Sequence, residues 1–268
     1  MVNKAENKIV LDSITWSFSS VNCYATCPHM FYLQYIQCVA REDNAFAQWG
    51  SFGHSLLERY YKGEAEFFEL ASIYEQEYKK HVTCRFPFNK YAILNRTYSD
   101  AGLDYFQNFE GDFSDCEVLG VEQEIRITVG GYPFVGYIDL ILRDRTDGGI
   151  ILCDHKSKSK FKNRAERAAY LHQLYLYAIY IRQKYGTYPK KLVFNMFRSQ
   201  AMVEEAFDSL ALQQAEAWFA GTIEVIYADT AFSPKPDKFF CDNLCGARKF
   251  CSCSRYYSHR LAEGGGAD

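Results

Sequence analysis

The sequence has few of the features that mark fibrous, membrane-spanning or disordered proteins. Its 268 residues include only 6 prolines and 17 glycines, too few for a collagen-like or linker-dominated chain. No apolar run approaches the roughly 20 residues that a membrane-spanning helix needs, and the opening residues, MVNKAENKIVLDS, lack the apolar segment of a secretory signal. With 48% hydrophobic and 17% aromatic residues, we expect a folded globular protein, cytoplasmic, with reduced thiols.

The chain also has no overall positive charge, although its charge is unevenly distributed. The formal net charge is -3, which by itself gives no indication of nucleic-acid binding. Residues 156–198, however, contain eleven Lys or Arg and one acid, so this segment carries +10 while the remainder carries -13. One part of the surface is therefore predicted to be strongly basic.

The hydrophobic pattern predicts helices first and then a mixed sheet. We expect two short helices over 18–38, broken at Cys27-Pro28, with further helices over 46–80 and 98–110. Three β-rich runs between 117 and 156, separated by Gly-Gly and Asp-Gly-Gly, predict an antiparallel meander. A helix over 163–185, a strand over 191–198 and a helix over 208–228 complete a mixed α/β fold.

Two aspartates and a lysine lie on neighbouring strands of this meander. Asp139 is in the middle strand and Asp154 is near the end of the next, so pairing of these strands can bring both carboxylates to one divalent cation. Lys156 is two residues after Asp154 and projects to the same face. Such groups are often solvated surface residues, but the apolar contexts IDLIL and IILCD favour a metal-dependent site suited to phosphodiester hydrolysis.

The arrangement GYID, spacer, ILCDHK resembles the PD-(D/E)XK nuclease superfamily. Asp139 matches its first acid, Asp154 its second, with Asp where many members have Glu, and Lys156 its lysine. In the following helix HQLYLYAIY, Gln173 and Tyr177 resemble the Q-x-x-x-Y motif of RecB-like nucleases. The resemblance implies a restriction-endonuclease-like core, a mixed sheet flanked by helices, with a helical N-terminal region and a C-terminal Cys-rich iron-sulfur clasp.

The resemblance also nominates residues around this core. FGHSLLERYY resembles the helix that carries a histidine metal ligand, which implies His54 as a ligand and Glu58 as its support. The carbonyl of His155 would also reach the metal, expected to be Mg2+ or Mn2+. Glu124 falls where members often keep an acid.

Five of the ten cysteines are candidates for a metal site. Cys241, Cys245, Cys251 and Cys253 alone could bind structural zinc. The RecB-like, AddB-like and CRISPR-associated RecB-like exonuclease branch instead has an iron-sulfur cluster held by both ends of the chain. That resemblance implies a 4Fe-4S cluster bound by Cys27, Cys241, Cys245 and Cys251, although the C-x3-C gap departs from the usual C-x2-C and leaves Cys253 as a substitute for Cys251.

A basic run follows the proposed catalytic strand. An isolated run of this kind is usually a solvated face, but beside Asp154 and Lys156 it favours contact with a DNA backbone. The five residues are Lys158, Lys160, Lys162, Arg164 and Arg167.

Together these features predict a single nuclease domain over 1–268. It comprises a mainly helical region (18–115), a catalytic α/β core (116–200), a helix with the Cys-rich clasp (201–255) and a flexible tail (262–268). The predicted activity is a metal-dependent exonuclease acting on DNA ends or single strands, with any helicase, recombination or CRISPR partner on another chain because no G-x-x-x-x-G-K-[ST] motif occurs. The alternatives are a non-catalytic DNA-binding scaffold and a zinc-stabilised enzyme of another class.

Overall fold

The computed structural model describes residues 4–111 and 113–258, so the predicted tail over 262–268 lies outside the described residues. The described chain divides into two compact units. The first unit contains residues 1–44, 128–134 and 217–268, so it includes both terminal segments, and the second contains 45–127 and 135–216. Each unit is described by itself below.

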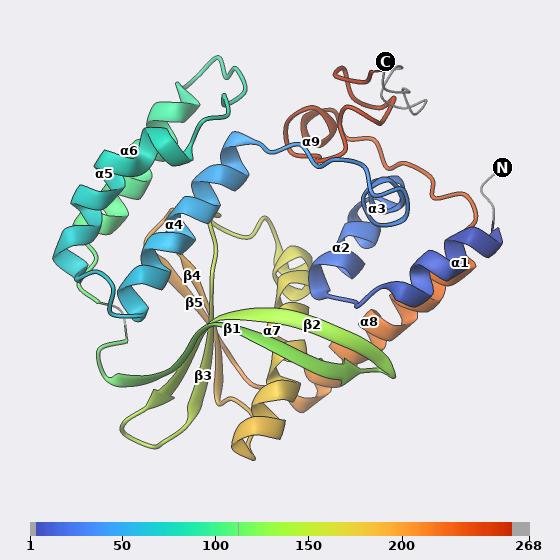
Figure 1. The fold of residues 1–268 in the computed structure, drawn as a ribbon. Coiled ribbons are helices and arrows are strands. Elements are labelled where there is room, and N and C mark those ends of the chain that lie inside the picture. Colours follow the sequence, from blue (N-terminus) through green and yellow to red (C-terminus); the bar gives the residue numbers. More distant parts are fainter. Residues whose placement is uncertain (1–3, 112, 259–268) are drawn as a thin grey trace. The chain divides into compact units, whose positions relative to one another are not determined.

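Helices account for more of the described residues than strands do, and Figure 1 labels α1 to α9. They are α1 (Lys4–Ser13), α2 (Phe18–Thr26), α3 (Pro28–Phe31), the π-helical η1 (Tyr32–Ile36), α4 (Ala45–Tyr61), the 3-10 turn η2 (Phe67–Glu69), α5 (Leu70–His81), α6 (Leu94–Gln107), α7 (Arg164–Tyr185), α8 (Ser209–Ala228) and α9 (Lys238–Asn243). None of the helices in the described part of the chain is long and apolar enough to cross a membrane.

The strands form one five-stranded mixed sheet in the order β1-β2-β3-β4-β5. They are β1 (Cys116–Val129), β2 (Tyr132–Asp144), β3 (Ile150–His155), β4 (Lys191–Met196) and β5 (Ala201–Ala206). The pairs β2/β3 and β4/β5 are antiparallel, whereas β3 and β4 are parallel and joined through α7. The predicted mixed α/β fold is therefore confirmed, and its sheet flanked by helices is consistent with a restriction-endonuclease-like core.

Glycine sets the turn of the first hairpin. Gly130 and Gly131 connect β1 to β2, and their φ angles of 54° and 86° lie in the left-handed region that a two-residue hairpin turn requires. The Gly-Gly signal in the sequence thus corresponds to a tight turn. The sequence pattern does not predict β5, because its alternating exposure and two glutamates give a weak β signal.

Strand β3 is completely buried and presents alternate residues to two helical layers of the second unit. Ile151 and Cys153 belong to an apolar cluster against which Tyr61 of α4 packs. Asp154 is on the other face of the strand, since successive side chains alternate. This alternation directs Asp154 and Lys156 toward α7, while His155 points toward α4; in Figure 1 these helices lie on different sides of the strands.

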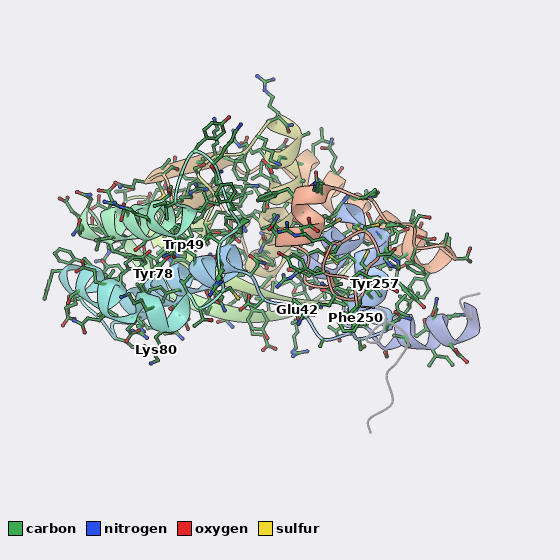
Figure 2. The ribbon with its side chains drawn as sticks, turned by 90° about the horizontal axis from the view of Figure 1, so that it is seen from above. Glu42, Trp49, Tyr78, Lys80, Phe250 and Tyr257 are labelled. Carbon is green, nitrogen blue, oxygen red and sulfur yellow. The ribbon has the colours of Figure 1, made fainter. Side chains whose placement is uncertain are left out.

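Helices α4, α5 and α6 form an aromatic core in the second unit, where Figure 2 labels Trp49 and Tyr78. The Trp49 indole N–H donates to the Tyr74 hydroxyl at 2.9 Å, and both residues are buried. Gly53 allows α4 to approach Phe197 after β4, because a Cβ at Gly53 would lie 2.7 Å from that ring. This close approach fixes the position of the next residue, His54.

The first unit brings the two terminal segments of the described chain together. Helix α2 ends at Thr26 and Pro28 begins α3, which confirms the predicted break. Glu42 donates its backbone N–H to the Gly246 carbonyl at 2.7 Å and forms an ion pair with Lys249 at 3.0 Å. Figure 2 accordingly places Glu42 beside Phe250.

Candidate active site

The two predicted aspartates lie on paired strands of the second unit. Leu140 is opposite Cys153 at the end of this antiparallel pairing, and Asp139 and Asp154 are the next residues along the two strands. Their side chains are only 12% and 4% exposed. The Asp139 carboxylate accepts the backbone N–H of His155 at 2.7 Å, which orients it at the end of β3.

Three potential metal ligands gather around Asp139. Its Oδ2 lies 3.5 Å from His54 Nδ1, and one ligand atom from each of His54, Glu122 and Asp139 lies within 4.8 Å of the others. The backbone of His155 forms a hydrogen bond with the His54 ring, so it also belongs to this group. An imidazole and carboxylate oxygens are donors that Mg2+ or Mn2+ accepts in proteins.

Glu122 is a member of this group that the sequence reasoning missed. It lies within β1 with a φ of 47°, in the left-handed region that non-glycine residues rarely adopt. Such local distortions in strands redirect a side chain and are common beside active sites. The sequence VEQEIRI contains two glutamates two residues apart, and only this backbone irregularity distinguishes them.

The electrostatics of these groups favour a bound cation. Burial and the neighbouring Asp154 carboxylate raise the pKa of Asp139 well above its usual range. Burial and Glu58 raise the pKa of Glu122, whereas burial lowers the pKa of His54 and so keeps its imidazole neutral near pH 7. Crowded, desolvated carboxylates beside a neutral imidazole fit a divalent cation, which would offset their repulsion.

Lys156 connects the aspartates to helix α7. Its ammonium lies 2.6 Å from Asp154 Oδ2 and donates to Gln173 Oε1 at 3.1 Å. Gln173 in turn donates from Nε2 to the Tyr177 hydroxyl at 3.0 Å. Burial opposes the charge of Lys156, but Asp154 and Asp139 outweigh it and raise its pKa, so the lysine is a cation.

His155 lies on the opposite face of β3, where its ring is fully packed. It stacks on Tyr61 with 5.9 Å between ring centroids, and its Nδ1 lies 3.1 Å from the Asn195 side-chain amide. Burial lowers its pKa well below the usual value, so the ring stays neutral. The side chain therefore packs in the core while its backbone faces the site.

Two residues proposed as supports lie in separate ion pairs. Glu58 contacts Lys62 one turn along α4, at 2.5 Å. Glu124 pairs with Arg126 at 2.6 Å and accepts the Tyr137 hydroxyl at 3.1 Å. The structure thus places Glu124 apart from the ligand group, although Glu58 still acts electrostatically on both His54 and Glu122.

The basic run after β3 is only partly free to contact a ligand. Lys158 forms an ion pair with Glu166 at 2.6 Å, and Arg167 pairs with Glu205 at 2.5 Å. Three other cations of this run, Lys160, Lys162 and Arg164, are exposed. These three form the exposed positive charge that follows β3.

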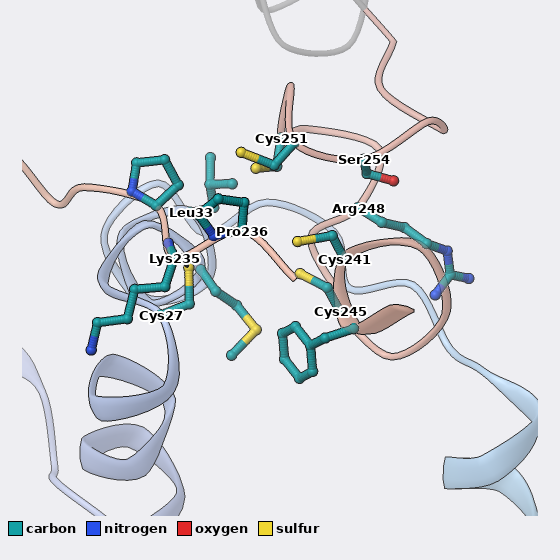
Figure 3. A pocket seen from close by; sticks show the side chains of 13 residues that line it. Cys27, Leu33, Lys235, Pro236, Cys241, Cys245, Arg248, Cys251 and Ser254 are labelled. Carbon is teal, nitrogen blue, oxygen red and sulfur yellow. Dashed lines mark hydrogen bonds between the residues drawn. The ribbon is translucent and has the colours of Figure 1, made fainter. Parts of the chain in front are cut away.

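The cysteine site lies wholly within the first unit. A pocket there is lined by Cys27 from the α2–α3 junction and by four C-terminal cysteines, and the sulfurs labelled in Figure 3 point toward a common space. The four are Cys241, Cys245, Cys251 and Cys253. All ten cysteines are described and free of disulfides.

The donors of this pocket fit a metal cluster. Burial raises the pKa of Cys245, and burial together with Cys253 raises that of Cys251 to about 12. Several thiolates in one apolar pocket would therefore need positive charge from bound metal. Cys27 additionally accepts the backbone N–H of Lys235 at 3.5 Å, a contact that would stabilise a thiolate ligand.

The family of the chain follows from comparison with known proteins. The profile of the PD-(D/E)XK nuclease superfamily matches residues 15–252. The chain belongs to the PD-(D/E)XK nuclease superfamily, and a divalent metal is the cofactor of its nucleases. The match includes the aspartates, the lysine and the helix α7 residues described above.

Two solved structures align with nearly the whole chain. A Eubacterium rectale protein named "Putative exonuclease" is 12% identical with a TM-score of 0.45, covering 98% of this chain and 96% of its own. A protein named SSO0001 is 17% identical with a TM-score of 0.36, covering 93% of each chain. No curated protein sequence matches.

Proposed function

We propose that this protein is a metal-dependent deoxyribonuclease of the RecB-like branch, acting as an exonuclease on DNA ends or single strands. The observation that carries the proposal is the contact chain from Asp154 through Lys156 and Gln173 to Tyr177, next to the ligand group around Asp139. A scaffold that only bound DNA would have no need of a buried lysine held between a carboxylate and an amide.

The metal would be held by His54, Asp139 and Asp154 with the His155 carbonyl, and Glu122 would join them. When bound there, Mg2+ or Mn2+ supplies activation of the attacking water and offsets charge that develops on the phosphoryl oxygens. Asp139 is already oriented by the His155 N–H, and His54 is held against the Phe197 ring at a centroid distance of 5.8 Å. The protein thus positions its own ligands before DNA binds.

Lys156 stabilises negative charge at the scissile phosphate. Its side chain is 16% exposed, so one side can meet substrate while Asp154 and Gln173 hold the other. Gln173 keeps the lysine side chain in one conformation, and Tyr177, which is 4% exposed, holds the glutamine. Gln173 and Tyr177 therefore act by positioning Lys156 or by steadying the adjacent strand of substrate.

DNA reaches this site along the exposed cations after β3. Lys160, Lys162 and Arg164 are not among the described ion pairs of the basic run, whereas Lys158 and Arg167 are. Contacts of exposed cations with phosphates give affinity without sequence preference. The biological setting would be recombination, repair, phage replication or CRISPR adaptation, with any DNA-unwinding partner on another chain.

The first unit would hold a 4Fe-4S cluster through Cys27, Cys241, Cys245 and either Cys251 or Cys253. Both alternatives line the same pocket. Such a cluster supplies covalent ties between the N-terminal and C-terminal segments. Its role in this proposal is structural.

The cysteine proposal is tested by iron content and colour after anaerobic purification. Wild type should be brown with about four irons per chain, whereas Cys27→Ser should lose most of its iron and melt at a lower temperature. Cys153→Ser is the matched control, because Cys153 is buried in the second unit and does not line this pocket. Colourless wild type with stoichiometric zinc would contradict the cluster.

The nuclease proposal is tested with end-labelled single-stranded and duplex DNA in Mg2+ or Mn2+. Wild type should degrade DNA from an end, while Asp154→Ala and Lys156→Ala should be at least about 100-fold slower, because each removes a preorganised charge. Equal degradation by all three proteins would contradict the assigned site. Addition of EDTA should stop the reaction.

A further inference from the structure

The loop between α5 and α6 in the second unit exposes an unusual group of apolar side chains. Phe88 is 93% exposed, Tyr91 83% and Ile93 73%. Beside them, residues 82, 84–89 and 92–95 line an open hollow of about 460 Å³. Single exposed apolar residues are common, but three within six positions beside a hollow indicate a binding surface.

The loop and the residues next to it in the sequence are predominantly basic. Residues 78–99 contain five basic residues and no acid. All five are exposed, and one of them, Arg96, is paired with Asp100 at 3.4 Å. The five are Lys79, Lys80, Arg85, Lys90 and Arg96. Protein interfaces are depleted in charged residues at their centre, whereas cations interleaved with aromatic rings are typical of surfaces that bind single-stranded nucleic acid.

The rings are displayed by an ordered turn. The Gln48 side chain accepts the backbone N–H groups of Thr83 and Cys84 at 2.9 and 2.8 Å, which fixes the start of the loop. Asn89 accepts the N–H groups of Tyr91 and Ala92 at 2.8 and 3.2 Å. The geometry of the exposed rings is therefore set before any ligand binds.

Tyr91 is also paired with a cation. The Lys90 ammonium lies 4.6 Å from the centroid of the Tyr91 ring. A base stacked on the free side of this ring would have its phosphate within reach of Lys90. One nucleotide could thus contact both residues.

Helix α4 and Phe197 connect the loop to the candidate active site. Gln48 precedes His54 by six residues of α4, which corresponds to about 9 Å along the helix axis. Phe197 contacts both the Trp49 and the His54 rings, at centroid distances of 5.1 and 5.8 Å. The adjoining Arg198 places its guanidinium 4.0 Å from the ring centroid of Tyr98, which stacks on Phe86 of the loop.

We infer that the α5–α6 loop is a base-stacking site for single-stranded DNA, at which Phe88 and Tyr91 hold unpaired bases while Arg85 and Lys90 contact phosphates. Single-stranded rather than duplex DNA is the occupant, because the faces of paired bases are covered by their neighbours. The inference rests on the proposed function and adds a second contact region, beyond the cations that follow β3.

The test measures binding of fluorescein-labelled oligothymidylate and of a blunt duplex by anisotropy, in EDTA so that no hydrolysis occurs. Phe88→Ala/Tyr91→Ala should bind the single strand about 10-fold to 100-fold more weakly than wild type, because neither base can then stack on a ring. Binding of the duplex should weaken much less. Phe88→Trp/Tyr91→Phe keeps the rings and should restore single-strand binding.

Phe68→Ala is the matched control, since Phe68 is 69% exposed but lies in η2, at the opposite end of α5. It should bind both DNAs as wild type does. Arg85→Ala/Lys90→Ala should lower the slope of log K against log salt for the single strand by about 0.7 for each phosphate that the variant no longer neutralises.

Unchanged single-strand binding by Phe88→Ala/Tyr91→Ala, or equal weakening for single strand and duplex, would overturn this inference. Unchanged binding would favour a protein-docking surface, whereas equal weakening would favour a contact with the DNA backbone that does not depend on base stacking. Failure of the proposed function is distinguishable, since wild type would then bind DNA at this loop in EDTA yet hydrolyse no DNA with Mg2+ or Mn2+.

Discussion

Replacing Gln173 by alanine tests how the lysine of the site is positioned. The substitution removes the acceptor 3.1 Å from the Lys156 ammonium while leaving the Asp154 contact at 2.6 Å in place. A hydrogen bond to a charged group contributes about 1.5–3 kcal/mol. If that energy holds the lysine in its reactive position, Gln173→Ala should lower kcat by about 10-fold to 100-fold.

Single-turnover hydrolysis of labelled single-stranded DNA, with enzyme in excess, measures this effect directly. Tyr177→Phe removes the hydroxyl that accepts from Gln173 and that also bonds the Tyr137 backbone. Loss of the neutral bond to Gln173, worth about 1 kcal/mol, should slow the reaction roughly 5-fold. Lys156→Ala should be slower than either, and adding Gln173→Ala to it should cost little more, because the two residues act as a unit. A fully additive double variant, or a Gln173→Ala protein as fast as wild type, would refute the reasoning.

Three further predictions concern separate groups of the second unit. Glu122→Gln should raise the Mn2+ concentration for half-maximal activity by about 10-fold to 100-fold, while Glu124→Gln, in its ion pair away from the site, should leave it unchanged in the same titration. The Lys190 ammonium and Thr146 lower the pKa of Asp144, so this carboxylate stabilises the fold fully above its unfolded pKa of about 4, and the effect shrinks as the pH falls toward the lowered folded pKa. Asp144→Asn should therefore be less stable than wild type in urea at pH 7, and the difference should become smaller between about pH 4 and pH 2. A constant difference over this range would contradict this. Lys160→Ala should weaken single-strand binding for all sequences alike and lower the salt slope by about 0.7, and a sequence-dependent effect would contradict a backbone contact.

Strand β3 and helix α7 could be predicted because their signals are local. Asp154 and Lys156 are two residues apart on one strand, and Gln173 and Tyr177 are four apart on one helix, so each pair must share a face. The structure brings the two pairs into contact across β3 and α7. The Gly-containing turns in the sequence predict hairpins, and hairpins make the strands that carry Asp139 and Asp154 neighbours in the sheet.

Other features depend on the backbone in ways that a linear pattern does not encode. Glu122 and Glu124 are two residues apart, so a regular strand would place both side chains on the same face. The left-handed conformation at Glu122 changes this: Glu122 lies near His54, whereas Glu124 pairs with Arg126. The strand β5 escapes prediction because an edge strand with two adjacent glutamates lacks a strong hydrophobic signal. The α5–α6 loop carries no motif, and its significance comes from exposure, which only a folded structure shows.

The most direct test of the account is the metal-dependent hydrolysis of single-stranded DNA by wild type, Asp154→Asn and Asp147→Asn. Asp154 is buried beside Lys156, whereas Asp147 lies on the exposed turn of the same hairpin, paired with Lys190. The account predicts that Asp154→Asn loses at least about 1,000-fold in single-turnover rate, from several kcal/mol of lost charge stabilisation, while Asp147→Asn cleaves as wild type does. Equal rates for Asp154→Asn and wild type in Mn2+ would contradict it.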